Sequence, residues 1–197
     1  MIMGNKKIDY LVFAAEKREV SSFLKKAKKV NDRVFLITIN NKRILLIVTG
    51  VGKNAIKRTL KNQNEFLQDI KAEKTFNLGN AGALKSIKAS TILKIGKSFG
   101  NNGKEKLILD SSSHVENITV NSLQNKKKLS RQFNNAYTVD MELFHLAKAY
   151  PQIISYKIIL DTFRFNPKSI IFKFILPLLA KKNNKLLYNF FISKYCS

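Results

Sequence analysis

The chain of 197 residues is basic, with 36 lysine and arginine residues against 13 acidic ones and a net charge of +23. Its hydrophobic content of 45% suffices for the core of one domain, and its single cysteine, Cys196, excludes an intrachain disulfide or a cysteine-based metal site. No apolar run reaches the roughly 18–20 residues that span a bilayer, and residues 1–9 do not form a secretory signal, so we expect a cytoplasmic protein.

Apolar runs and amphipathic stretches alternate along the chain. The runs that predict strands are residues 8–15, 33–40, 42–48, 74–78, 91–95, 106–109 and 153–160. The stretches that predict helices are residues 16–27, a long segment after the loop Thr49–Gly52, and residues 123–133, 141–150 and 169 onward. A hairpin turn is expected at Asn40-Asn41, a further turn at Gly79–Gly82, and a helix break near Pro177.

This alternation predicts an α/β fold for the single domain expected over residues 1–197. We expect a three-layer sandwich around a mixed, mostly parallel sheet. We expect the interior strands to contain residues 8–14, 43–48, 74–78 and 154–160. The basic, apolar C-terminal segment, residues 168–197, predicts either a helix that covers the core or an interfacial helix in peripheral contact with anionic lipid.

The positive charge raises the hypothesis of a nucleic-acid-binding surface. The sequence argues against it, because 30 of the basic residues are lysines, whereas arginine is the usual residue for bidentate recognition of bases and phosphates. The lysines are also spread along the chain without a nucleic-acid-binding motif. Lys126–Lys128, for instance, is expected to be a solvated helix face.

Polar residues stand where the predicted strands end, which is the edge at which ligands bind in folds of this class. The segments concerned are Glu16 to Glu19, Gly50–Lys53, Gly79–Gly82 and Asp161, together with Asp140-Met141-Glu142 at the start of a helix. No cluster of histidine, aspartate and glutamate has the spacing of metal ligands. The sequence therefore predicts a site without a metal or cofactor.

Taken in chain order, these segments resemble the nucleoside phosphorylase superfamily, and within it the methylthioadenosine/S-adenosylhomocysteine nucleosidases and the hopanoid-biosynthesis phosphorylases. The matching segments are Ala14–Val20, Thr49–Lys53 (like TGIGK), Asn77–Leu84 (like NTGSAGGL), Val139–Glu142 (like V(E/D)ME) and Leu160-Asp161 (like SD). Five motifs in the right order, over residues 8–165, make the resemblance fairly specific.

The resemblance implies cleavage of the N-glycosidic bond of a purine nucleoside, an adenosine derivative, in an enzyme that forms a homodimer or larger oligomer. Asp161 would protonate the purine N7, and Glu19 would orient the attacking water. Glu142 would accept hydrogen bonds from the ribose hydroxyls, and Met141 would pack against the sugar. The remaining substrate-binding candidates are Asn80, Gly82 and Glu16, which is the alternative to Glu19 as the residue that faces the site.

Departures from the family pattern leave alternatives open. Asn80 replaces a serine or threonine that binds phosphate in the phosphorolytic members, which favours hydrolysis. Leu160 replaces the small polar residue before the acid, and no base-binding aromatic segment is recognisable before Val139. A catalytically weakened nucleoside-binding or scaffold relative, and a phosphorylase acting on a lipid-linked adenosine, are therefore the competing hypotheses. The acidic residues and glycines could also serve only as helix caps and turns.

Overall fold

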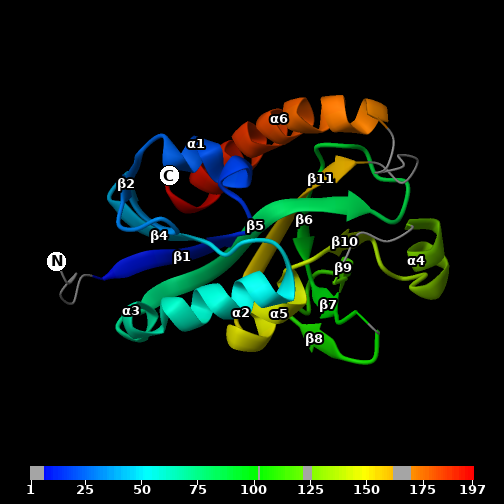
Figure 1. The fold of residues 1–197 in the computed structure, drawn as a ribbon, viewed down its shortest axis with the longest axis horizontal. Coiled ribbons are helices and arrows are strands. Elements are labelled where there is room, and N and C mark those ends of the chain that lie inside the picture. The colour runs from blue at the N-terminus through cyan, green and yellow to red at the C-terminus, as the bar shows by residue number, and fades with distance from the viewer. Residues whose placement is uncertain (1–6, 102, 122–125, 162–169) are drawn as a thin grey trace.

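The computed structural model describes residues 7–101, 103–121, 126–161 and 170–197, the last segment with its side chains from residue 178 onward. One mixed sheet of eleven strands passes through these residues, with helices on both of its faces (Figure 1). The strands are β1 Ile8–Ala14, β2 Ala27–Lys29, β3 Val34–Ile39, β4 Lys42–Val48, β5 Ala72–Ala83, β6 Ile92–Ile95, β7 Lys97–Phe99, β8 Lys106–Ile108, β9 Glu116–Thr119, β10 Thr138–Asp140 and β11 Ile154–Asp161. The helices are a 3₁₀ turn Lys17–Val20, α1 Ser21–Leu24, α2 Gly52–Asn62, α3 Asn64–Gln68, α4 Lys126–Gln132, α5 Leu143–Ala149 and α6 Ile170–Tyr195.

The sheet order is β2-β3-β4-β1-β5-β10-β9-β7-β8, with β11 also beside β5 and β6 beside β11. The central neighbours β4, β1, β5 and β11 run parallel, whereas the hairpin β3-β4 and the outer pairs β2-β3, β7-β8 and β6-β11 are antiparallel. The predicted α/β class is thereby confirmed, and the four segments expected in interior strands lie in β1, β4, β5 and β11.

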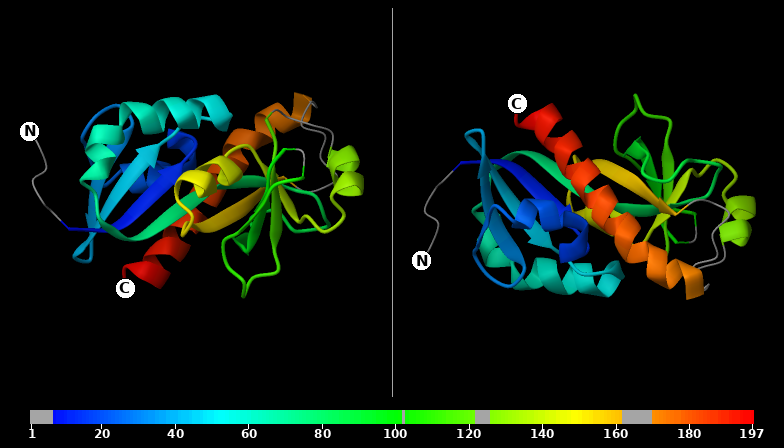
Figure 2. Two further views of the ribbon diagram at one scale, coloured as in Figure 1. Left: turned by 90° about the horizontal axis from the view of Figure 1, so that it is seen from below. Right: turned by 90° about the horizontal axis from the view of Figure 1, so that it is seen from above.

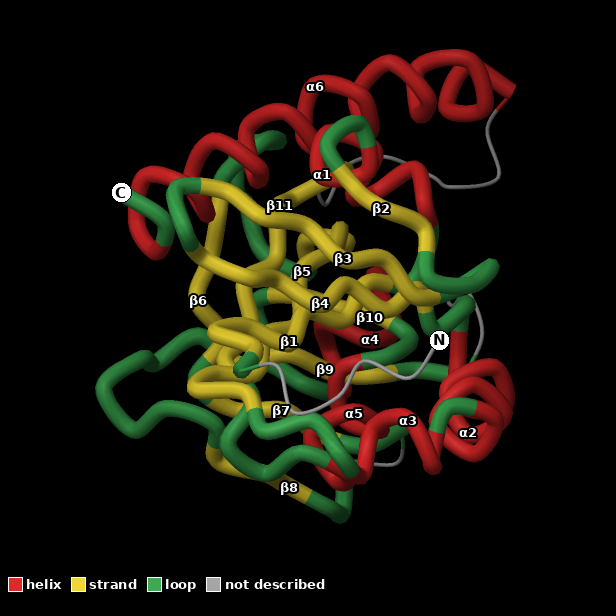
Figure 3. The backbone as a smooth tube through the Cα atoms, turned by 90° about the vertical axis from the view of Figure 1, so that its left-hand side faces the viewer, coloured by secondary structure: helices red, strands yellow, loops and turns green. Residues whose placement is uncertain are grey.

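The helices divide into two layers. In Figures 1 and 3, α1 and α6 lie on one side of the strands, and α2, α3 and α5 lie on the other. Figure 2 shows α6 as one long helix that crosses its layer obliquely to the central strands. No helix among the described residues combines the length and apolar character needed to cross a membrane.

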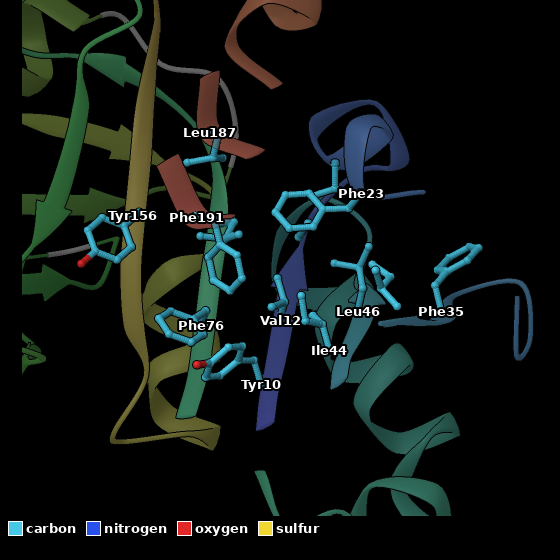
Figure 4. Close-up of a cluster of buried hydrophobic side chains, with 14 of the residues drawn as sticks. Tyr10, Val12, Phe23, Phe35, Ile44, Leu46, Phe76, Tyr156, Leu187 and Phe191 are labelled. Carbon is cyan, nitrogen blue, oxygen red and sulfur yellow. The ribbon is translucent and has the colours of Figure 1, made fainter. Parts of the chain in front are cut away.

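From Tyr10 to Ala14 strand β1 is made of apolar and aromatic residues, because both of its faces are buried there. Its alternate residues point to opposite sides, so Val12 packs in the layer of α1 and α6 with Phe23 and Phe191. Phe13 packs in the other layer with Ile56 of α2. An aromatic cluster centres on Phe76, whose ring centroid lies 5.6 Å from that of Tyr10 and 5.1 Å from that of Phe191 (Figure 4). From Ala180 to Tyr195 the helix α6 thus covers the core, and the buried Cys196 follows it.

Three local predictions were wrong. Gly79–Gly82 is not a turn, because these residues continue β5 and pair with β10 and β11. The helix expected over residues 16–27 is only a 3₁₀ turn and the short α1, since Ala27–Lys29 pairs with β3 as a lysine-rich edge strand. Helix α6 continues through residue 177, where a break was expected, and is held along the sheet by its packing from Ala180 onward. Of the helix expected over residues 123–133, residues 123–125 lie outside the described residues.

Candidate functional site

Glu19 lies at the carboxyl end of β1 and connects it to β5. The 3₁₀ turn after β1 directs its side chain inward, where Oε2 accepts hydrogen bonds from the backbone N–H groups of Ala15 at 3.1 Å and Glu16 at 3.2 Å. Its Oε1 accepts two more from Asn80, from the backbone N at 3.0 Å and from Nδ2 at 3.1 Å. Four N–H groups therefore fix the orientation of this carboxylate.

Glu16 occupies a different environment. Its carboxylate forms a surface ion pair with Arg18. The geometry thus places Glu19, and not Glu16, on the side of the strand ends. Glu19 also caps the 3₁₀ turn, because its side chain accepts the N–H of Glu16 at the start of the turn.

Glu142 is buried just before α5 and reaches across to the first residue of α2. Its Oε1 accepts the backbone N–H of Gly52 at 3.1 Å. Gly52 has φ +80°, a conformation that favours glycine, and a Cβ built there would lie 3.8 Å from Cε of Met141. Burial, followed by the negative charges of Asp140 and Glu19, raises the pKa of Glu142 to about 7, although Lys157 acts in the opposite direction.

A buried ion pair between Lys157 and Asp140 lies close to Glu142. Nζ of Lys157 lies 2.7 Å from Oδ2 of Asp140, and the side chains are 2% and 1% exposed. Burial alone would raise the pKa of Asp140, but Lys157 outweighs it and holds the pKa below its usual value. Asp140 also accepts hydrogen bonds from Thr119 Oγ1 at 2.7 Å and from the backbone N of Leu143 at 3.0 Å. The helix-start role considered for Asp140 is therefore present.

Lys157 has its own pKa raised, because the charges of Asp140 and Glu142 outweigh the lowering effect of burial. Sequence reasoning missed this residue. Its only signal was a lysine in the middle of the apolar run that forms β11. A buried lysine needs a paired carboxylate, so that position could have pointed to a buried partner, though not to which one.

Asp161 ends β11 and forms a second buried ion pair with Lys126, the first residue of α4. Nζ of Lys126 donates to Oδ2 of Asp161, and the side chains are 9% and 8% exposed. Burial raises the pKa of Asp161, and Lys126 opposes that shift without cancelling it. The prediction that Lys126 belongs to a solvated helix face was therefore wrong, whereas Lys127 and Lys128 are exposed.

Gly82 leaves the space that this pair occupies. A Cβ built on Gly82 would lie 3.0 Å from Oδ1 of Asp161 and 3.1 Å from Cε of Lys126. Neither Gly82 nor Gly79 has a positive φ, so close approach and not turn geometry is the reason for glycine at position 82. Gly82 also pairs with Val139 of β10, which brings the segment ending in Glu142 to the same end of β5.

The candidate residues come together in part. Glu19 is in contact with Asn80, and the negative charge of Glu19 contributes to the raised pKa of Glu142. Asp161 lies over Gly82, two residues along β5 from Asn80. Beside Glu142, a hollow of about 290 Å³ is lined by Val51, Gly52, Lys53, Asn54, Asn121 and Met141. That all of the candidates line one ligand pocket stays a prediction.

The raised pKa of Glu142 predicts a pH-dependent stability. Between pH 4.5 and 7 the native state holds a proton on Glu142 that the unfolded chain has released, so the free energy of unfolding should fall as pH rises through this range. The contribution is on the order of 3 kcal/mol. Urea unfolding of the wild type and of Glu142→Gln should diverge across this interval, because the amide does not titrate. Parallel pH profiles for the two proteins would show that Glu142 titrates normally.

Comparison with solved structures supplies close matches in fold. The 5′-methylthioadenosine/S-adenosylhomocysteine nucleosidase from S. pneumoniae, solved with a transition-state inhibitor, has a TM-score of 0.73 at 15% identity and covers 93% of this chain and 98% of its own. The Neisseria meningitidis nucleosidase, in complex with methylthio-immucillin-A, has a TM-score of 0.71 at 16% identity, covering 91% and 96%. The futalosine hydrolase of Helicobacter pylori has a TM-score of 0.73 at 14% identity, covering 92% and 96%. No family profile and no curated protein matches this chain in sequence.

Proposed function

We propose that this chain, which has the fold of the nucleoside phosphorylase and nucleosidase superfamily as its motifs predicted, hydrolyses the N-glycosidic bond of a purine nucleoside. The observation that supports the proposal is the position of three carboxyl groups relative to β5: Glu19 bonds to Asn80, Asp161 lies beside Gly82, and Glu142 follows β10, which pairs with Gly82. These carboxylates come from segments far apart in the sequence, and all are at least partly buried. Glycosidic cleavage needs this kind of set, with an acid at the leaving group and a base on the far side of the sugar.

The proposed reaction assigns one role to each carboxyl group. The bond between C1′ and N9 breaks and its electron pair goes to the base, while the carboxylic acid of Asp161 donates a proton to N7. The oxygen of a water molecule forms the new bond to C1′, and Glu19 accepts the proton that this water releases. Glu142 accepts hydrogen bonds from the ribose hydroxyls. The products are ribose and the neutral base.

The environments of these groups suit their roles. Burial raises the pKa of Asp161, which favours the protonated acid that the leaving group requires. Glu19 is held by four N–H groups, so the orientation of its carboxylate is fixed, and a water molecule that approaches it competes with one of these donors. Ionised Glu142 is the better acceptor for ribose, and its pKa of about 7 places that form at and above neutral pH.

Water is the proposed nucleophile because Asn80, which stands at the family's phosphate-binding position, already forms hydrogen bonds within the protein. The side-chain amide of Asn80 donates to Glu19 and accepts a hydrogen bond from Asn183 of α6 at 3.4 Å. Two arginines beside the motifs are also engaged, Arg18 by Glu16 and Arg33, next to Gly50, by the backbone carbonyl of Val48. A phosphate ion would have to displace these contacts.

The test is release of free base from a panel of purine nucleosides, with and without inorganic phosphate. We expect base and ribose to form at the same rate in both conditions. Strict dependence on phosphate, with ribose 1-phosphate as the product, would replace hydrolysis by phosphorolysis. A heat-denatured sample and the Glu19→Gln variant provide the background rates.

A second candidate function is nucleoside binding without turnover. The contact of Asp161 with Lys126 favours it, because an ammonium group beside a carboxyl opposes its protonation. Nucleoside binding in a titration, combined with no base release from any member of the panel, would select this alternative. The adenosine substrate, the homodimer and the lipid contact of residues 168–197 stay predictions.

A further inference from the structure

Lys126 is the residue near the proposed acid that neither the motifs nor the proposed reaction accounts for. Its ammonium group contacts Asp161, and a Cβ built on Gly82 would lie 3.1 Å from Cε of Lys126 and 3.0 Å from Oδ1 of Asp161. Both side chains are therefore over the same end of β5. A purine with N7 beside Asp161 can therefore also contact Lys126.

The edge of the purine that carries N7 also carries the group at carbon 6. In adenine the group at carbon 6 is an amino group, so this edge presents one acceptor, N7, and one donor. In a 6-oxopurine the group is a carbonyl, so the same edge presents two acceptors. A carboxylic acid on its own matches adenine, since its O–H donates to N7 and its other oxygen accepts from the amino group. Here that other oxygen, Oδ2, accepts from Lys126.

An ammonium group can only donate hydrogen bonds. The Lys126–Asp161 pair therefore offers two donors side by side, the acid O–H for N7 and the ammonium N–H for a carbonyl at carbon 6. An adenine amino group would instead bring its own donors against the ammonium group. Burial of the pair strengthens this discrimination, because a mismatched polar group there loses its hydrogen bonds to water.

We propose that Lys126 is a specificity-determining residue that reads the carbonyl at carbon 6, so that the substrate is a 6-oxopurine nucleoside and not the adenosine derivative that the sequence motifs implied. The proposal rests on the proposed function, in which Asp161 protonates N7. Gly82 contributes by leaving room for both side chains.

The test compares kcat/KM for inosine and adenosine in the wild type, in Lys126→Gln and in the matched control Lys128→Gln on the exposed face of the same helix. The wild type should favour inosine by about 10- to 100-fold, the discrimination expected from one well-formed pair of contacts to a base edge. With Asp161 still donating to N7, the side-chain carbonyl of a glutamine can accept from the amino group of adenine, so Lys126→Gln should reverse or abolish the preference. Lys128→Gln should retain it.

A wild type that prefers adenosine, or a preference for inosine that Lys126→Gln leaves unchanged, would overturn the assignment. Faster cleavage of both nucleosides by Lys126→Gln would also overturn it, since Lys126 would then merely block the acid. If no nucleoside is cleaved, the proposed function fails, and calorimetric binding of hypoxanthine against adenine to the wild type decides the inference separately. Tighter binding of hypoxanthine supports it and tighter binding of adenine contradicts it; this comparison also serves if the variant does not fold.

Discussion

Replacement of Asp161 by asparagine is expected to lower kcat for base release by about 10²–10⁴-fold, the usual contribution of a general acid. The amide has nearly the same shape and can still accept the hydrogen bond of Lys126, but it has no acidic proton to give to N7. Nucleoside binding should therefore change little. Steady-state kinetics and calorimetric titration on the same preparation measure the two quantities.

Asp69→Asn provides the matched control, because Asp69 is an exposed aspartate at the end of α3 and should show wild-type kinetics. Circular dichroism must first show that Asp161→Asn is folded, since its partner Lys126 is buried. An unchanged kcat in the folded variant would remove Asp161 from the mechanism. A loss of binding as large as the loss of rate would make it a binding residue.

Replacement of Lys157 by methionine is expected to lower the free energy of unfolding by about 3–5 kcal/mol, because it leaves Asp140 as a buried charge without its counter-ion. The pair is almost completely shielded from water, which is the condition under which loss of one partner costs most. Urea unfolding at pH 7 measures the change. The double variant Lys157→Met with Asp140→Asn removes both charges and should recover most of the loss.

Lys148→Met is the control for an ion pair of the opposite kind. Lys148 pairs with Glu105 on the surface, where the side chains are 52% and 56% exposed, so the expected loss is only about 0–1 kcal/mol. A comparable small loss for Lys157→Met would show that the Lys157–Asp140 pair is not a structural requirement. A double variant no more stable than Lys157→Met would contradict the assignment of the loss to an uncompensated charge.

The central strands were predictable because their sequence signal is local. In β1 and β4 nearly every side chain is buried, so the apolar runs needed no knowledge of their neighbours. The hairpin at Asn40-Asn41 was equally local, since both residues adopt the positive φ that asparagine tolerates. Short strands such as β9 and β10 carry no such run and are defined by their pairing, β10 with β5 and β9, and β9 also with β7.

The parts of the site that sequence reasoning missed depend on contacts between distant segments. Gly79 and Gly82 looked like turn residues, but strand pairing and close side chains require them in β5. Whether Glu16 or Glu19 points toward β5 depends on a 3₁₀ turn. The spacing of apolar residues expected for an α-helix does not predict such a turn. Lys126 stands in a run of three lysines, and only its burial against Asp161 separates it from the exposed Lys127 and Lys128.

The most direct test of the proposed site is a crystal structure with a carbon-linked purine nucleoside, whose bond between sugar and base cannot be hydrolysed. We predict that Asp161 lies within hydrogen-bond distance of N7 and that Glu142 contacts the ribose hydroxyls. Glu19 should face C1′ from the side opposite the base. Binding of the nucleoside elsewhere, for example in the lysine-lined hollow of about 640 Å³ beside Phe144 and His145, would contradict the assignment of these three carboxyl groups to one reaction.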